Sequence, residues 1–231
     1  MKSATAGMAG NDGFISASPD YIMAIKGIIF DLDGTLVSTR PEYRYIVTGS
    51  ALSELGVSRG RQDIDRFWFG PDRDATVRSW GVDASRFWKA FRKYDTTELR
   101  KKHACPFQDV RVLDSIRRMG IKAGIVTGSP EHIASLEIGM LNFDFDAIVI
   151  ANDSQGIRQK PHPQGILECM RMMGLGRDDI LFVGNGEEDV EASRRAGVGM
   201  VLIDRGENKI DCFGGSRISG LEELMEMIKR R

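Results

Sequence analysis

IIFDLDGTL, at residues 28–36, is the stretch that decides the fold, because an apolar run ends there in two carboxylates. The run from Ile25 to Phe30 predicts a buried strand, and Gly34 allows a sharp turn after it. Asp31 and Asp33 lie two positions apart, so both side chains leave the same side of an extended chain and can reach one metal or one substrate. Crowded carboxylates cost free energy unless a metal, proton or cation compensates them. One could act as nucleophile and metal ligand and the other as general acid/base, whereas the simpler alternative is a strand-end turn.

The composition excludes some classes of partner. The chain has 231 residues, 42% of them hydrophobic and 28% charged, with a net charge of -1, so its charge favours neither nucleic acid nor an anionic membrane. No apolar run approaches the roughly 20 residues of a membrane span. Cys105, Cys169 and Cys212 form no CxxC pair and no disulfide framework, which favours a reducing cytoplasm. Residues 1–22 are small, polar and rich in Gly, Ala and Ser, so we expect a disordered leader or tag, with Met23 a candidate start.

The pattern along the chain predicts an α/β fold with a doubly wound parallel sheet. Five apolar strands, covered on both faces, alternate in their later part with helical stretches that often end at glycine. We expect strands at Ile25–Phe30, Ile121–Val126, Ala147–Ile150, Ile180–Val183 and Val198–Ile203. We expect helices near Phe107–Met119, Pro130–Leu141, Pro163–Met173, Glu187–Ala196 and Leu221–Lys229.

Residues 41–105 contain helical patterns and no convincing strand, so they predict an inserted second domain. The core would then comprise residues 23–40 and 106–231, with hinges near Ser38–Pro41 and Ala104–Phe107. The aromatic residues of the insert are expected to form its own small core. The expected helices are Glu42–Leu55, Ile64–Phe69, Ala75–Trp80 and Ala84–Arg100, and the basic residues Arg92, Lys93, Arg100, Lys101 and Lys102 are expected on a solvated face.

Three further strand ends carry polar groups, and ligands of open parallel sheets bind at such ends. The second strand leads into Thr127-Gly128-Ser129-Pro130, which suits an anion at a helix N-terminus or is simple capping. Lys160 follows the third strand and precedes a helix, where an anionic partner would suit it better than the helix dipole does. The fourth strand ends in the acidic stretch 184–189, which suits magnesium or caps its helix.

Together these strand ends resemble the haloacid dehalogenase superfamily over about residues 25–205. Residues 31–35, DLDGT, match the first motif in full, Thr127 the second, Lys160 the third, and Gly184-Asn185 with Asp189 the fourth. The helical insert resembles the cap of phosphoglycolate-phosphatase-like and beta-phosphoglucomutase-like members. The resemblance implies the sheet order 5-4-1-2-3.

The activity that the resemblance implies is Mg²⁺-dependent hydrolysis of a small phosphorylated metabolite, phosphoglycolate-like or a sugar phosphate. Asp31 would form an aspartyl-phosphate and Asp33 would act as acid and base. The phosphate would be bound by Thr127, Gly128 and Lys160. The metal ligands would be Asp31, the Asp33 carbonyl and the fourth-motif residues Asn185 and Asp189. Dehalogenation is disfavoured, because members with that chemistry lack the second acid. The sequence does not distinguish a monomer from a homodimer.

One departure from the family pattern stands out. The residue after the fourth-motif glycine is normally aspartate, and here it is Asn185. An amide still offers an oxygen but no negative charge, so we expect weaker magnesium binding with activity retained. The alternatives are a phosphomutase, which Val183-Gly184-Asn185 disfavours because it lacks an extra acid, and a non-catalytic phosphate or partner binder.

Overall fold

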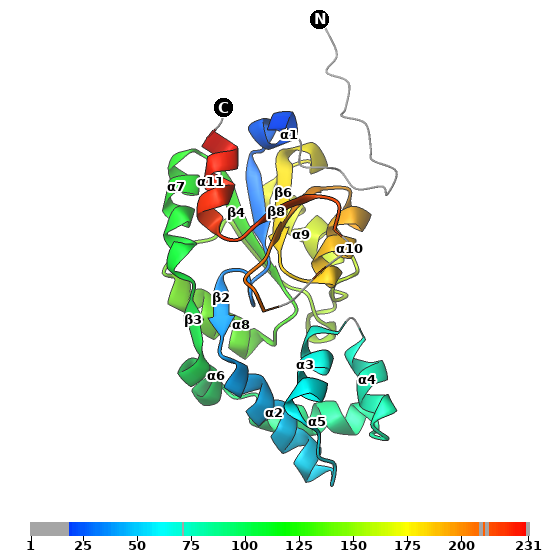
Figure 1. The fold of residues 1–231 in the computed structure, drawn as a ribbon. Coiled ribbons are helices and arrows are strands. Elements are labelled where there is room, and N and C mark those ends of the chain that lie inside the picture. The colour runs from blue at the N-terminus through cyan, green and yellow to red at the C-terminus, as the bar shows by residue number, and fades with distance from the viewer. Residues whose placement is uncertain (1–18, 71, 208–209, 211–212, 230–231) are drawn as a thin grey trace, which may run out of the picture.

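The computed structural model describes residues 19–70, 72–207, 210 and 213–229. Within these residues, the main sheet has six parallel strands in the order β5-β4-β1-β6-β7-β8. Helices α2 to α6 form a separate group beyond the carboxyl ends of the strands, on the side opposite α1 (Figure 1). The strands are β1 (Gly27–Phe30), β4 (Lys122–Thr127), β5 (Ala147–Ile150), β6 (Ile180–Gly184), β7 (Gly199–Ile203) and β8 (Ser216–Ile218).

The predicted order 5-4-1-2-3 is confirmed, because β7, β6, β1, β4 and β5 are the fifth, fourth, first, second and third predicted strands. β8 is an addition that the sequence analysis missed, a three-residue strand of which only Ile218 is buried. In the register of the sheet, Phe30 pairs with Ile125 on one side and with Val183 on the other. The polar segments that follow these strands therefore begin at one edge of the sheet.

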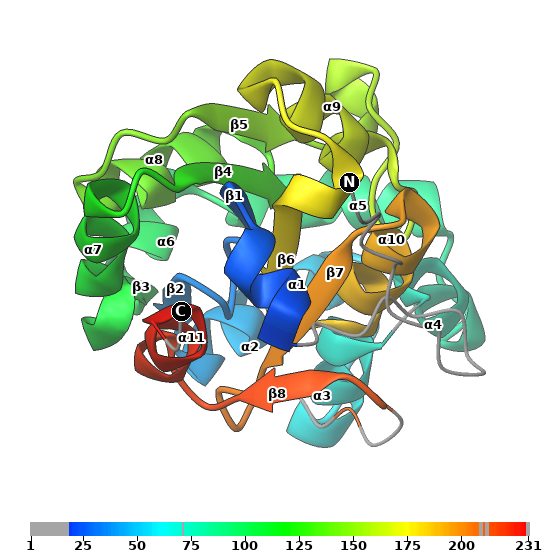
Figure 2. The same ribbon diagram turned by 90° about the horizontal axis from the view of Figure 1, so that it is seen from above.

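Helices cover both faces of the sheet, as Figure 2 shows with α9 and α10 on one side and α7 and α11 on the other. Alternate residues of β1 supply the two cores: Ile28 and Phe30 pack with α7, α8 and α11, while Ile29 packs with α9 and α10. All three are fully buried, which explains the continuous apolar run. The helices are α7 (Val112–Arg118), α8 (Glu131–Leu141), α9 (Gln164–Met173), α10 (Glu187–Ala196) and α11 (Leu221–Lys229).

The expectation of a disordered leader over residues 1–22 is wrong for its last four residues. Helix α1 spans Pro19–Ala24, and its Ile22 is buried in the core. The Tyr21 hydroxyl accepts a hydrogen bond from the Gly199 amide at 2.9 Å and donates to the Ile180 carbonyl. A chain that began at Met23 would lose these contacts between α1 and the sheet. Residues 1–18 lie outside the described part.

The inserted segment consists of helices that pack around aromatic side chains. Tyr43, Phe67, Phe87 and Phe91 are buried there, and Trp68, Trp80 and Trp88 pack against them. We propose residues 41–105 as the cap on this ground. Its helices are α2 (Pro41–Glu54), α3 (Arg61–Phe69), α4 (Arg73–Ser79), α5 (Ala84–Tyr94) and α6 (Thr97–His103).

The predicted helix Ala84–Arg100 is in fact two helices, α5 and α6. The chain turns at Asp95, and the Thr96 side chain caps α6 by accepting a hydrogen bond from the Leu99 amide. This cap satisfies a free amide at the start of the new helix.

Two short strands join the cap to the core. β2 (Val37–Thr39) and β3 (Ala104–Pro106) form an antiparallel pair in which Ser38 lies opposite Cys105. β3 lies within the expected hinge Ala104–Phe107, and β2 overlaps the expected hinge Ser38–Pro41 but begins one residue before it. The sequence analysis expected no strand at either place. None of the helices in the described part of the chain is long and apolar enough to cross a membrane.

Candidate active site

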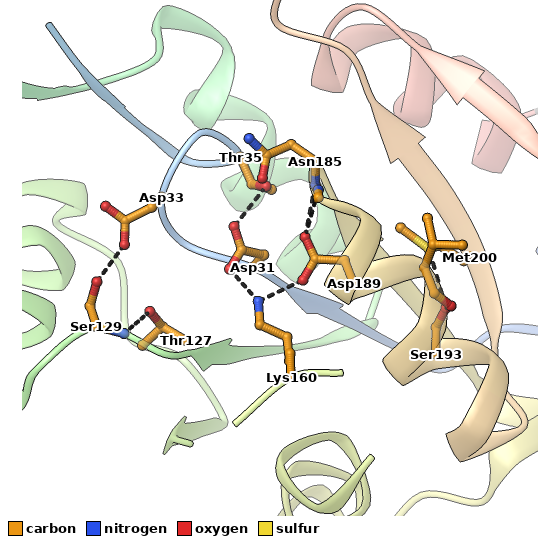
Figure 3. A network of polar contacts seen from close by, with 12 residues as sticks. Asp31, Asp33, Thr35, Thr127, Ser129, Lys160, Asn185, Asp189, Ser193 and Met200 are labelled. Carbon is orange, nitrogen blue, oxygen red and sulfur yellow. Dashed lines mark hydrogen bonds and ion pairs between the residues drawn. The ribbon is translucent and has the colours of Figure 1, made fainter. Parts of the chain in front are cut away.

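Asp31 is the first residue after β1, at the edge of the sheet that faces the cap. Its amide donates to the Val183 carbonyl of β6, which continues the ladder for one residue and fixes the direction of the side chain. One carboxylate oxygen accepts from Lys160 Nζ at 2.6 Å, and the other accepts from Thr35 Oγ1 at 3.1 Å. Asp31 is 6% exposed, so it is a buried acid held from two sides (Figure 3).

Lys160 reaches this acid from the connection between β5 and α9. Its ammonium also donates to Asp189 Oδ1 at 2.6 Å, so a single cation is shared by two carboxylates. The other oxygen of Asp189 accepts from the amides of Asn185 and Gly186, at 3.0 and 2.9 Å. Asp189 therefore both caps the start of α10 and holds Lys160 in place (Figure 3).

The charges of this cluster do not balance. Burial raises the pKa of Asp31 to about 7, because desolvation together with the nearby Asp189 outweighs the attraction of Lys160. Burial alone would lower the pKa of Lys160, but the two carboxylates raise it, so Lys160 stays protonated. With both acids ionised, the cluster carries one negative charge in excess. A further cation at this position would stabilise the ionised form of Asp31.

Asp33 points away from Lys160 and toward the loop after β4 (Figure 3). Its Oδ2 accepts from the Ser129 hydroxyl at 2.6 Å, and its Oδ1 forms an ion pair with Arg100 of the cap. The side chain is 36% exposed, unlike that of Asp31. The two predicted catalytic acids thus have different surroundings: one is buried against a lysine, and the other is accessible and held at both oxygens.

The predicted phosphate-binding residues lie at the end of β4. Thr127 is the last residue of that strand and is buried, and its Oγ1 accepts from the Ser129 amide at 3.1 Å. Gly128 separates the two, and a side chain there would meet nothing within 4 Å. The loop leads into α8, whose first amides suit an anion. The structure thus brings Thr127, Gly128 and Lys160 to the same edge of the sheet as the acids.

Asn185 lies against the loop that carries the two aspartates. Gly34 adopts a φ of +75°, and a Cβ built on it would lie 2.1 Å from Asn185 Nδ2. Only glycine both adopts this backbone conformation without strain and leaves room for the amide. The first and fourth motifs are therefore in contact through Gly34 and Asn185.

The model of the family described as haloacid dehalogenase-like hydrolase matches residues 28–203. The chain belongs to this family. The chain is 27% identical to a phosphoglycolate phosphatase of Aquifex aeolicus, over 87% of this chain and 97% of that protein. It is 29% identical to a phosphoglycolate phosphatase of Pseudomonas syringae pv. tomato, over 79% of this chain and 71% of that protein. A crystal structure of a predicted phosphatase from Clostridium acetobutylicum has the same fold, with a TM-score of 0.76 at 19% identity, covering 90% and 100% of the two chains.

The oxygen donors of this site fit a magnesium ion that has few anionic protein ligands. Magnesium is often held by one or two carboxylates with water and substrate oxygens. The excess negative charge beside Asp31 would attract the ion, and the side-chain amide of Asn185 offers an oxygen ligand. The described residues contain no group of three or more His, Cys, Asp and Glu side chains that could by themselves hold a metal ion. The metal-ligand roles of Asp31, Asp33, Asn185 and Asp189 stay predictions.

The sequence analysis missed several residues of the site. Thr35 and Ser129 stand inside quoted motifs, and their hydroxyl groups next to the acids were the available signal. Arg100 was placed on a solvated face, which is wrong: it is 3% exposed and pairs with Asp33 and the buried Glu137. His132 Nε2 is hydrogen-bonded to the Asp95 carbonyl of the cap at 3.1 Å, a contact between core and cap that the sequence analysis did not identify.

Proposed function

We propose that this protein is a phosphatase that hydrolyses small phosphorylated metabolites through an aspartyl-phosphate on Asp31. The observation that carries the proposal is the buried acid Asp31 bonded to Lys160, with the accessible acid Asp33 two residues away. The relatives named phosphoglycolate phosphatase support this reaction class. A phosphoglycolate-like compound or a sugar phosphate is the proposed substrate, and the cytoplasm is the proposed compartment.

In the first step Asp31 attacks phosphorus, and the bond between phosphorus and the leaving oxygen breaks. Asp33 gives its proton to that oxygen, so the alcohol leaves neutral. Thr127, Gly128 and Lys160 would hold the phosphoryl oxygens as negative charge develops on them. The hydrogen bond from Thr35 keeps the second oxygen of Asp31 in place during the attack.

In the second step water attacks the phosphorus of the phosphorylated Asp31. Asp33, now ionised, takes the proton from that water, and the bond between phosphorus and the Asp31 oxygen breaks. Inorganic phosphate leaves, Asp31 is again a carboxylate, and Asp33 carries the proton that the next cycle uses. The paired roles of Asp33 require an acid that is accessible to both leaving group and water, as its exposure allows.

A magnesium ion would supply charge neutralisation at the phosphoryl group. Asp31, the Asp33 carbonyl and Asn185 would hold it, with Asp189 beside them. The excess negative charge of the Asp31, Lys160 and Asp189 cluster supports a cation there. Because Asn185 is neutral, we expect looser binding than an aspartate would give.

The proposal is tested by phosphate release from p-nitrophenyl phosphate, with and without magnesium. We expect magnesium-dependent turnover that Asp31→Asn abolishes. Asp153→Asn changes the charge equally at an exposed position and serves as the matched control. Hydroxylamine should release the phosphate from phosphorylated wild-type protein, because hydroxylamine cleaves acyl phosphates. Absence of turnover with this substrate and with phosphoglycolate, at high magnesium, would refute the phosphatase assignment and favour a binding protein.

A further inference from the structure

Arg100 is a long cationic side chain in an unusual place. It belongs to α6, four residues before the hinge strand β3, and is 3% exposed. Burying a guanidinium is costly unless it is paired and hydrogen-bonded. Its neighbours Lys101 and Lys102 are exposed, so the burial is specific to this position of the basic run.

Three separate segments of the chain hold this guanidinium. It forms an ion pair with Asp33 of the loop after β1, and its Nε donates to Glu137 Oε1 of α8 at 2.6 Å. Its Cζ lies 4.6 Å from the ring centroid of Tyr43 in α2. Arg100 thus connects two cap helices to both the core and the catalytic loop.

Glu137 serves as the anchor of this arrangement. Its side chain is fully buried, and its Oε2 has no hydrogen-bond partner among the described residues. Burial raises its pKa, and Arg100 opposes that shift more than any other group. A buried acid with one cationic partner fixes the position of that partner, because the pair cannot exchange for water.

The second oxygen of Asp33 is bonded by Ser129 at 2.6 Å, so both oxygens of this carboxyl are engaged. One donor comes from the cap and the other from the core. A half-exposed aspartate would otherwise rotate freely about its side-chain bonds. The two donors together select one orientation of the ionised carboxylate. When Asp33 is protonated at Oδ2, the Ser129 hydroxyl can accept instead of donate, so the contact with Arg100 at Oδ1 still orients the group.

We propose that Arg100 is a positioning residue: anchored on Glu137, it orients the Asp33 carboxyl for proton transfer while the cap is closed. The proposal rests on the proposed phosphatase activity, in which Asp33 is the acid and base. Glu137 and Asp33 both belong to the core, so their contacts with Arg100 hold the guanidinium beside Asp33 while the cap lies over the site. Proton transfer is then effective only over a closed site, where bulk water is excluded.

The dependence of kcat/KM on the leaving group distinguishes a positioning role of Arg100 from a purely structural one. kcat/KM reports the steps through phosphorylation of Asp31, in which Asp33 protonates the leaving oxygen. Protonation matters more for a poor leaving group such as phenol than for p-nitrophenol. We therefore propose kcat/KM measurements with a series of substituted phenyl phosphates of similar size, at saturating magnesium.

The test variant is Arg100→Met, with Arg92→Met as the matched control, since Arg92 is an exposed cap arginine. For Arg100→Met we expect kcat/KM for phenyl phosphate to fall about tenfold to hundredfold, less than the roughly 10²–10⁴-fold of general acid catalysis as a whole because Asp33 itself is kept. For p-nitrophenyl phosphate we expect less than about a fivefold fall on the same reasoning. The plot of log kcat/KM against leaving-group pKa should steepen, and Arg92→Met should follow the wild type.

A second variant guards against misfolding, because Arg100→Met leaves Glu137 buried and unpaired. The double variant Arg100→Met with Glu137→Leu replaces the pair by apolar groups, which restores stability without restoring the donor to Asp33. We expect it to keep the steep slope. An equal loss across the series, or a slope that returns to the wild-type value in the double variant, would overturn the positioning role. Failure of the wild type to hydrolyse these esters and phosphoglycolate would instead refute the proposed function.

Discussion

Replacing Asp31 with asparagine removes one of the two carboxylates that share the Lys160 ammonium. The amide oxygen can still accept from Lys160, and the amide nitrogen can donate to the Thr35 hydroxyl, so the hydrogen bonds of the site are preserved. The remaining pair of Lys160 and Asp189 is neutral. We therefore expect Asp31→Asn to stabilise the metal-free protein while it abolishes turnover.

The size of the effect follows from the raised pKa of Asp31. The folded state holds this proton with a pKa of about 7, against an ordinary value of 3.8. A carboxyl whose pKa is raised by folding adds stability below its unfolded pKa, and that stability is lost as the pH rises to the folded pKa. At about 1.36 kcal/mol per pKa unit, Asp31 lowers the free energy of unfolding by about 4 kcal/mol at pH 8, where it is ionised in the folded state, and by about 2 kcal/mol at pH 5, where folding must take up a proton. Asparagine escapes this cost.

The assay is urea denaturation of the wild type, Asp31→Asn and the exposed control Asp153→Asn, in chelator at pH 5 and pH 8. The free energy of unfolding of Asp31→Asn should exceed that of the wild type, and the gain should be larger at pH 8. The control should lie within about 0.5 kcal/mol of the wild type at both values. An Asp31→Asn variant no more stable than the wild type at pH 8, or one with the same gain at both pH values, would refute the argument from excess charge.

Three other substitutions test the site. Asn185→Asp adds a negative oxygen, so the magnesium concentration for half-maximal turnover should fall about tenfold; an unchanged value would argue against a metal contact at this position. Lys160→Met leaves two buried acids without their cation, so urea denaturation should show a loss of about 3–5 kcal/mol. Adding Asp189→Leu should recover only part of that stability, because it also removes the cap of α10, and it should recover no phosphate release. Gly34→Ala places a Cβ 2.1 Å from Asn185 Nδ2 at a φ of +75°, so stability should fall by about 1–3 kcal/mol and turnover with it; an unaffected variant would show that this contact is not needed.

The sequence predicted best what depends on the regular geometry of a parallel sheet. Asp31, Thr127 and Lys160 are far apart in the chain, yet each follows a recognisable strand, and the carboxyl ends of parallel strands share one edge. The sheet order came from the resemblance rather than from any pattern in the residues. β8 was missed because a three-residue strand with one buried side chain carries too little apolar signal.

Long-range partners explain the other differences. Arg100 stands in a run of basic residues, and its burial depends on partners that are distant in the sequence, Glu137 and Asp33 of the loop after β1. The break between α5 and α6 contains no glycine or proline. The helix N-cap at Thr96 was therefore a weak signal beside a continuous helical pattern, and the sequence analysis predicted one helix. Tyr21 lies in a segment of low-complexity appearance, and its contact with Gly199 spans most of the chain.

The pairing of β2 with β3 has a consequence for how the cap moves. Val37–Thr39 and Ala104–Pro106 are hydrogen-bonded to each other over their whole length, so the two crossings between cap and core form one ribbon. Two independent tethers would permit translation and twisting in several directions. Pairing couples the two crossings, so we expect them to bend together when the cap moves relative to the core. We therefore expect the cap to approach the sheet along a narrow range of paths, so that closure would bring the same side chains back to the same atoms.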